Sequence, residues 1–173
     1  MSIWDRILNR EFFKIELRET ITDVLSTMYQ VAKAFIYQGS RLLLQLRDNN
    51  PDIYYPNYWG LFGGEIDPGE TAECAIAREM EEEVRWQPSD IEFLFLWEND
   101  HPKCLVHLFA IPLVIPTSQL TLTEGQALKL FTLEESLQVP TVPIFRPTLP
   151  KAIPMIESPE LQLAWKVLSE QPI

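Results

Sequence analysis

The chain has 173 residues, of which 46% are hydrophobic and 23% are charged, a composition typical of one globular domain rather than a disordered chain. Its formal net charge of −11 argues against nucleic acid and anionic membranes as partners, because both repel an acidic surface. No uncharged run is long enough to cross a bilayer, and the N-terminus has no apolar core of signal-peptide length. Cys74 and Cys104 are too few for a disulfide framework, so we expect a cytoplasmic protein with reduced thiols.

The first part of the chain predicts an extension, two strands and a loop. Residues 1–28 alternate charged and apolar positions and are interpreted as an N-terminal extension, which could pack on the core or on a second subunit of a homodimer. Strand-like runs at 31–37 and 41–47 are separated by a turn at 38–40. Residues 49–64 are polar, aromatic and proline-containing, which suits a loop closing over a site.

A helix is predicted over residues 71–85, which contain many good helix formers and neither Gly nor Pro. Thr71 can cap its first turn. The apolar residues Ala72, Ile76 and Met80 recur at every fourth position, so we expect them to form a stripe that packs on the core.

The second part of the chain predicts three more strands and a short helix. The strands are expected where β-branched and aromatic residues are frequent, at 91–99, 104–115 and 127–131. Thr132 and Glu135 have the spacing of a capping box, which predicts that a short helix begins there.

The C-terminal part, residues 140–173, is interpreted as a proline-rich tail followed by a helix. Prolines interrupt residues 140–154 repeatedly, so we predict an extended chain that wraps the surface. Ser158, followed by a proline, offers an N-cap for a final helix through Ser169. No linker divides the sequence, and one domain is therefore expected over residues 1–173.

The segment from Gly63 to Trp86 crowds eight carboxylates and two arginines into one short stretch. Within it, Glu79, Glu82 and Glu83 have the spacing i, i+3, i+4, which places all three side chains on one helix face. Side by side they repel one another, whereas a divalent cation turns that repulsion into binding. Hard carboxylate oxygens suit Mg²⁺ or Mn²⁺ rather than zinc. The alternative is a solvated acidic helix face, which is the more frequent reading of such a run by itself.

The loop that enters this helix has features of a ligand site. Gly63 and Gly64 permit backbone conformations that let carbonyl oxygens approach a ligand closely. The turn residue Gly69 aims the chain into the helix. Arg78 can pair with Glu70, which would hold the loop on the helix.

The spacing of this segment resembles the Nudix box, G-x5-E-x7-R-E-U-x-E-E-x-G-U, where U is a bulky apolar residue. The matching positions are Gly64, Glu70, Arg78, Glu79, Met80, Glu82, Glu83 and Trp86. Arg85 stands where the family has Gly, which normally ends the helix in a left-handed conformation. Phe62 stands where the family usually has Pro.

This resemblance implies an α/β fold, a Nudix-type α/β/α sandwich with a mixed β-sheet. It implies a Mg²⁺- or Mn²⁺-dependent pyrophosphohydrolase that cleaves a nucleoside diphosphate linked to another group, by attack of water at phosphorus. Glu79, Glu82 and Glu83 would hold the metal, together with the Gly63 carbonyl. Gly64, Glu70 and Arg78 would shape the loop.

Three glutamates remain candidates for the catalytic base. Glu82 and Glu83 lie beside the expected metal. Glu124 lies in the sequence Thr-Glu-Gly-Gln, which is similar to a loop of mutator-type triphosphatases in the family, where its Glu completes the metal set or serves as base. The alternative is that Glu124 only opens the loop before the strand at 127–131. The residues alone do not choose between them.

Four residues are candidates for substrate contacts: Arg47, Tyr58, Trp59 and Phe62. The aromatic rings of Tyr58 and Trp59 could stack on a base, or they could pack the loop. His101 and His107 are interpreted as ordinary residues. A non-catalytic module that binds a nucleotide without cleaving it is the rival function, and a structural domain with a solvated acidic helix is a third; the intact glutamates argue against the rival.

Overall fold

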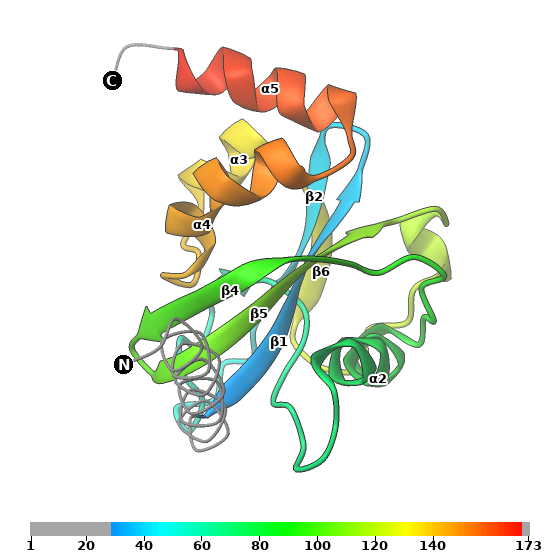
Figure 1. Ribbon diagram of the computed structural model, residues 1–173, viewed down its shortest axis with the longest axis vertical. Helices are drawn as coiled ribbons and strands as arrows, with labels where there is room; N and C mark the ends of the chain where they lie inside the picture. The colour runs from blue at the N-terminus through cyan, green and yellow to red at the C-terminus, as the bar shows by residue number, and fades with distance from the viewer. Residues whose placement is uncertain (1–28, 171–173) are drawn as a thin grey trace, which may run out of the picture.

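The computed structural model describes residues 29–170; the predicted N-terminal extension at 1–28 and residues 171–173 lie outside this range. Within it, six strands form one mixed sheet with β1 at its centre (Figure 1). β1 pairs antiparallel with β2 and parallel with β5, β4 follows β5 at the edge, and both β3 and β6 pair with β2. The strands are β1 (Gln30–Gln38), β2 (Arg41–Leu46), β3 (Trp59–Gly60), β4 (Glu92–Asp100), β5 (Lys103–Pro112) and β6 (Ala127–Thr132).

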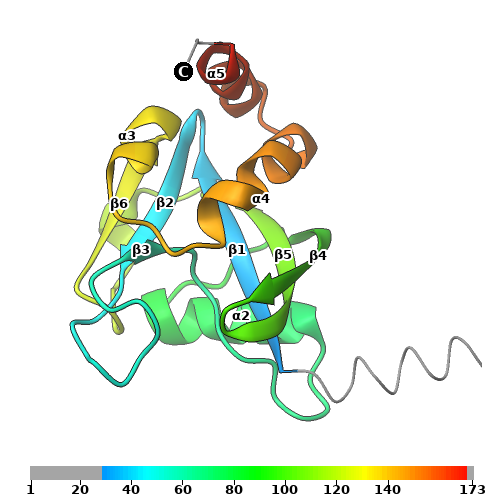
Figure 2. The same ribbon diagram turned by 90° about the vertical axis from the view of Figure 1, so that its left-hand side faces the viewer.

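The helices cover both faces of this sheet, which confirms the predicted α/β/α sandwich (Figure 2). α2 (Ala72–Val84) lies on one face, while α3 (Leu133–Gln138), α4 (Phe145–Ala152) and α5 (Pro159–Ser169) lie over the other. Two short 3₁₀ turns complete the elements, η1 (Thr117–Gln119) and η2 (Ile153–Met155). None of the helices in the described range is long and apolar enough to cross a membrane.

The alternation of side chains along β1 builds both halves of the core. Ala32, Ala34 and Ile36 are buried with the residues of α2, whereas Val31 and Phe35 are buried with those of α4 and α5. Successive residues of a strand point to opposite faces, so a central strand with helices on both sides is apolar in both registers. Each large apolar side chain buried in this way contributes about 1.5–3 kcal/mol.

The two ends of α2 follow the sequence prediction. The Thr71 side chain accepts a hydrogen bond from the Cys74 amide at 3.2 Å. At the other end Arg85 is left-handed, with φ 53° and ψ 42°, and its amide donates to the Glu81 carbonyl at 3.1 Å. The backbone path thus matches the one expected of glycine, and an arginine in this conformation costs about 1 kcal/mol. The departure from the Nudix pattern therefore leaves the helix end intact.

The prediction of an extended chain over residues 140–154 is wrong, because α4 occupies the middle of that segment. Its apolar residues Phe145, Leu149 and Ala152 are fully or almost fully buried at helical spacing. Pro147 lies in the first turn, where no helical amide bond is lost. Pro150 does lie inside the helix, just before α4 gives way to the 3₁₀ turn η2. Burial of the apolar stripe outweighs the proline penalty.

Candidate active site

The segment that contains the glycine pair runs along the central strand. The Ala34 amide donates to the Phe62 carbonyl at 3.1 Å, and the Ala32 amide donates to the Gly64 carbonyl at 2.9 Å. Gly63 between them has φ 111°, and a Cβ there would lie 2.1 Å from the Ala32 carbonyl oxygen. Only glycine fits this position, so the glycine brings the backbone of the loop directly onto β1.

Both polar groups of the Gly63 backbone are bound by charged side chains. Its amide donates to the Glu83 carboxylate at 2.8 Å, and its carbonyl oxygen accepts from the Lys33 ammonium. Glu83 is buried, and burial raises the pKa of its carboxyl group to about 7 against the opposing effects of Lys33 and the Gly63 amide. Burial also raises the pKa of Glu79 and lowers that of Lys33. Glu79, Glu83 and Lys33 therefore form one cluster of interacting charges beside Gly63.

Arg78 organises the glutamates on the exposed side of the helix. Its guanidinium makes two hydrogen bonds to the Glu70 carboxylate, at 3.0 and 3.1 Å, and donates to the Glu65 carbonyl at 2.9 Å. The same group contacts Glu79 at 2.8 Å and Glu82 at 3.0 Å. The predicted pairing of Arg78 with Glu70 is therefore present, and it ties the loop to α2.

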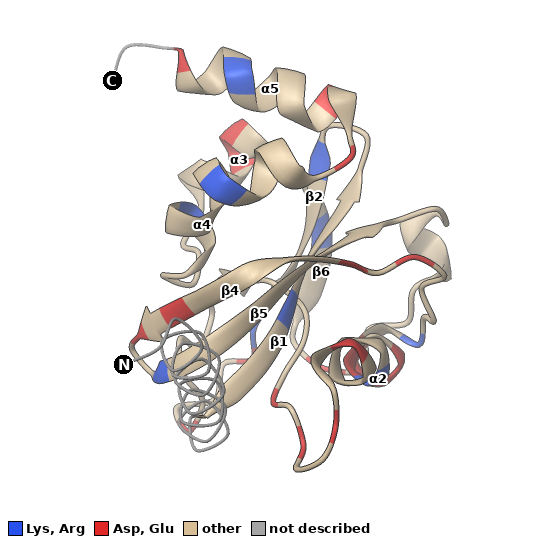
Figure 3. Cartoon of the chain, in the orientation of Figure 1, with Lys and Arg blue, Asp and Glu red and all other residues tan. Residues whose placement is uncertain are grey.

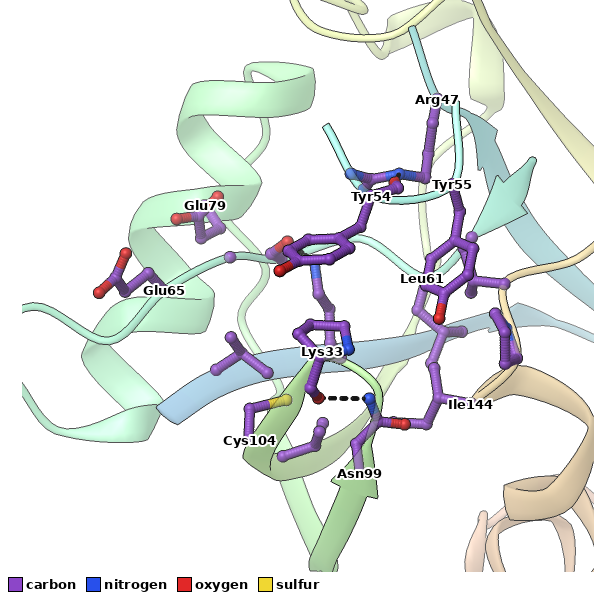
Figure 4. A pocket seen from close by; sticks show the side chains of 18 of the residues that line it. Lys33, Arg47, Tyr54, Tyr55, Leu61, Glu65, Glu79, Asn99, Cys104 and Ile144 are labelled. Carbon is purple, nitrogen blue, oxygen red and sulfur yellow. Dashed lines mark hydrogen bonds between the residues drawn. The ribbon is translucent and has the colours of Figure 1, made fainter. Parts of the chain in front are cut away.

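A cavity of about 310 Å³ opens beside this cluster. Acidic residues form one part of its wall, Tyr54 and Tyr55 form another, and Lys33 lies below the Tyr54 ring (Figure 4). The acidic part consists of Glu65, Glu79, Glu83 and Glu124. Acidic residues also gather along α2 and the loop before it (Figure 3).

The loop after β2 reaches across this cavity to the turn between β4 and β5. The Tyr55 hydroxyl donates to the His101 carbonyl at 2.7 Å, and the Tyr54 ring lies edge-on to the His101 ring at 6.1 Å. Arg47 donates to the Tyr54 carbonyl at 2.9 Å, which holds the loop at its other end. Sequence reasoning missed Tyr54 and Tyr55, although two adjacent aromatic residues in a proline-flanked loop were a signal that could have found them.

Half of the predicted site residues line this cavity. Its wall includes Arg47, Gly63, Gly64, Glu79, Glu83 and Glu124. The loop that carries Glu124 is fastened to α2, because the Thr123 amide donates to the Glu83 carbonyl at 2.9 Å. Glu82 is not on the wall; its half-exposed side chain pairs with Arg78 instead.

Three of the four predicted substrate contacts lie elsewhere. Phe62 is fully buried in the core under α2, so the prediction that it touches a substrate is wrong. Trp59 lies edge-on to Phe131 with 4.7 Å between the ring centroids, so its ring packs against the protein, the second of the two roles considered for it. Tyr58 is 5.9 Å from the Tyr55 ring, outside the cavity wall. His101, interpreted as ordinary, does line the cavity.

The predicted metal ligands already have protein partners. Within residues 29–170, no three His, Cys, Asp or Glu side chains converge closely enough to hold a metal ion. Arg78 binds Glu79 and Glu82, and Lys33 binds the Gly63 carbonyl. The donor chemistry nevertheless fits Mg²⁺ or Mn²⁺, because carboxylate and carbonyl oxygens are hard ligands. A divalent ion would have to displace some of these partners.

The chain matches a family model and a known protein. A family model described as a NUDIX domain matches residues 29–152. Over 122 residues the chain is 29% identical to a CTP pyrophosphohydrolase of Escherichia coli K12. The matched residues cover 70% of this chain and 89% of that protein.

Two solved structures are also similar. The solution structure of the E. coli ORF135 protein has a TM-score of 0.59 and 27% identity, covering 74% of this chain and 90% of that one. The crystal structure of a MutT NUDIX hydrolase from Burkholderia pseudomallei has a TM-score of 0.61 at 23% identity, covers 72% of this chain and 97% of that one, and supports the fold alone. Since the family model spans most of the sequence, the chain belongs to the Nudix family and is a hydrolase that acts on phosphoric anhydride bonds.

Proposed function

We propose that this hydrolase is a Mg²⁺- or Mn²⁺-dependent pyrophosphohydrolase that cleaves a nucleoside diphosphate linked to another group. The observation that carries the proposal is a cavity whose wall combines Gly63 and four glutamates with the rings of Tyr54 and Tyr55. The two parts of the cavity suit the two parts of a nucleotide. Cations held by the glutamates would bind the phosphates, and the tyrosine rings offer the base a flat apolar surface. Because a relative is named as a CTP pyrophosphohydrolase, CTP is the first substrate to test.

The metal would be held by oxygen atoms around Gly63. We assign the Gly63 carbonyl, Glu79 and Glu83 to this role, with Glu82 joining them when its carboxylate leaves Arg78. When bound, a divalent ion neutralises phosphate charge and lowers the pKa of a water molecule. Arg78 keeps the loop on α2 through Glu70, so the ligands stand on a rigid support.

Glu124 is the base that we propose takes the proton from the attacking water. It lines the cavity, whereas Glu82 does not. Glu83 also lines the cavity, but its carboxylate already accepts a hydrogen bond from the Gly63 amide at 2.8 Å, and the proposal gives it to the metal. A carboxylate within hydrogen-bond reach of the water is what general base catalysis needs.

The nucleoside half would lie against Tyr54 and Tyr55. Their loop is held by Arg47 at one end and by the His101 carbonyl at the other, so the rings are positioned before a substrate arrives. Ile144 adds an apolar surface on the same wall. Rings fixed in this way bind a base with little loss of conformational freedom.

A substrate panel tests this function. Purified protein is incubated with nucleoside triphosphates, CTP among them, and with nucleoside diphosphates linked to sugars or to a second nucleotide, and both products are identified by mass. We expect cleavage of at least one substrate with Mg²⁺ or Mn²⁺ and none in excess chelator, because the acidic wall repels phosphates without a cation. No turnover of any substrate with either metal would refute the catalytic proposal. Tight nucleotide binding that survives chelation would favour the non-catalytic binding module.

A further inference from the structure

Lys33 is a cation in an unusual place. It lies on the central strand β1, between Val31 and Phe35. All three side chains are on the side of the sheet that faces α4 and α5. Val31 and Phe35 are core residues there. Lysine is rarely buried without a partner, because its ammonium loses solvation. The Lys33 side chain is half-buried on the cavity wall, and burial lowers its pKa while Glu83 opposes that effect. The ammonium therefore depends on its protein partners.

The partner that it contacts is the Gly63 carbonyl oxygen, the atom that the proposed function gives to a metal ion. Glu79 and Glu83 also act on Lys33 electrostatically, so the lysine offsets the charge of the same acidic wall. A divalent ion that bound that oxygen would be brought close to the ammonium, and like charges repel in a partly buried site. The two cations therefore compete for one carbonyl.

The cavity offers the displaced ammonium one strong alternative, the phosphates of a substrate. Among the described residues, Lys33 and Arg47 are the lysine and arginine side chains of the wall, and Arg47 is bound to the Tyr54 carbonyl. Lysine carries its charge on a flexible four-carbon stem, which allows a move that a fixed guanidinium does not. Figure 4 shows Lys33 below the Tyr54 ring, with Glu79 on one side and Tyr55 on the other, and the phosphates would lie beside it.

We propose that Lys33 is a built-in counter-cation, which holds the Gly63 carbonyl in the metal-free protein and binds substrate phosphate once a divalent ion takes that oxygen. This inference rests on the proposed function and adds a phosphate-binding residue to it. It implies that metal and phosphate binding assist each other, since the ion frees Lys33 and the phosphate then keeps it away from the carbonyl. Removing the ammonium should strengthen metal binding and weaken substrate binding.

The test is Lys33→Met, which keeps the length of the side chain and removes its charge. Mn²⁺ binding is measured by calorimetry without nucleotide, and KM is measured at saturating Mn²⁺ on the substrate found in the panel. We expect the Kd for Mn²⁺ to fall at least about fivefold, because a competing charge is gone, and KM to rise about tenfold or more. The control Lys166→Met removes an equal charge from exposed α5 and should change neither value.

These opposite changes separate a phosphate-binding role from a structural one. A Lys33→Met protein that folds and binds Mn²⁺ like the wild type, or more weakly, overturns the inference while the proposed function stands; an unchanged KM also overturns it. If the wild type binds no Mn²⁺ but the variant does, competition by Lys33 is supported.

If neither binds Mn²⁺, the metal dependence of the proposed function fails and the inference fails with it. Should Lys33→Met not fold, Lys33→Gln, which can still donate to the Gly63 carbonyl, is judged by the same criteria.

Discussion

Glu83→Gln is expected to lower kcat by about 100- to 1000-fold, because it removes a charge that holds the metal and stabilises the transition state. Glutamine has nearly the same shape, and its side-chain oxygen can still accept the hydrogen bond from the Gly63 amide that is now 2.8 Å from the carboxylate. The substitution also removes the charge that acts on Lys33, so thermal unfolding reports any loss of stability separately from the loss of kcat. The measurements are kcat at saturating Mg²⁺ and thermal unfolding of the metal-free protein.

The matched control for this variant is Glu81→Gln. Glu81 lies on the same helix and loses the same charge, but it is absent from the cavity wall. Its kcat should stay within about twofold of the wild type, as expected for a charge outside the site. Equal losses in the two variants, or a fully active Glu83→Gln protein, would contradict the role given to Glu83.

Gly63→Ala should lower the free energy of unfolding by about 4 kcal/mol or more, one of the largest effects that a single substitution produces. The added Cβ would lie 2.1 Å from the Ala32 carbonyl oxygen and 2.8 Å from the Ile76 side chain. The φ of 111° is also one that a residue with a side chain adopts only under strain. Denaturant unfolding of the metal-free protein measures the loss.

Gly69→Ala separates the steric part of this effect from the backbone part. Gly69 also has a positive φ, 87°, but nothing lies within 4 Å of a Cβ placed there. Its substitution should cost only about 1–2 kcal/mol, the conformational penalty alone. If both variants lost the same stability, the close approach of Gly63 to β1 would not be the source of the effect.

The elements with regular apolar spacing were predictable from the sequence. Two strand-like runs separated by a turn identified β1 and β2, and the stripe of Ile76 and Met80 identified the face of α2 that packs on the sheet. The helix α4 was missed because its prolines were weighed above the helical spacing of Phe145, Leu149 and Ala152. Local propensity is a weaker guide than an apolar stripe that the sheet can bury.

The candidate site was predictable only where its residues are close together in the chain. The spacing of Glu79 and Glu83 on one helix determines that both reach the same face. Lys33 and Tyr54 come from other segments, and only the pairing of the loop with β1 brings Lys33 to Gly63. Phe62 failed as a substrate contact for the same reason, because its carbonyl pairs with β1 and its side chain falls into the core.

The most direct test of the metal-dependent mechanism is a crystal of the protein soaked in Mn²⁺ and measured at the manganese absorption edge. The account predicts an anomalous peak in direct contact with the Gly63 carbonyl and the carboxylates of Glu79 and Glu83. It would be contradicted if saturating Mn²⁺ left no ion there and Glu79 stayed bound to Arg78 at 2.8 Å.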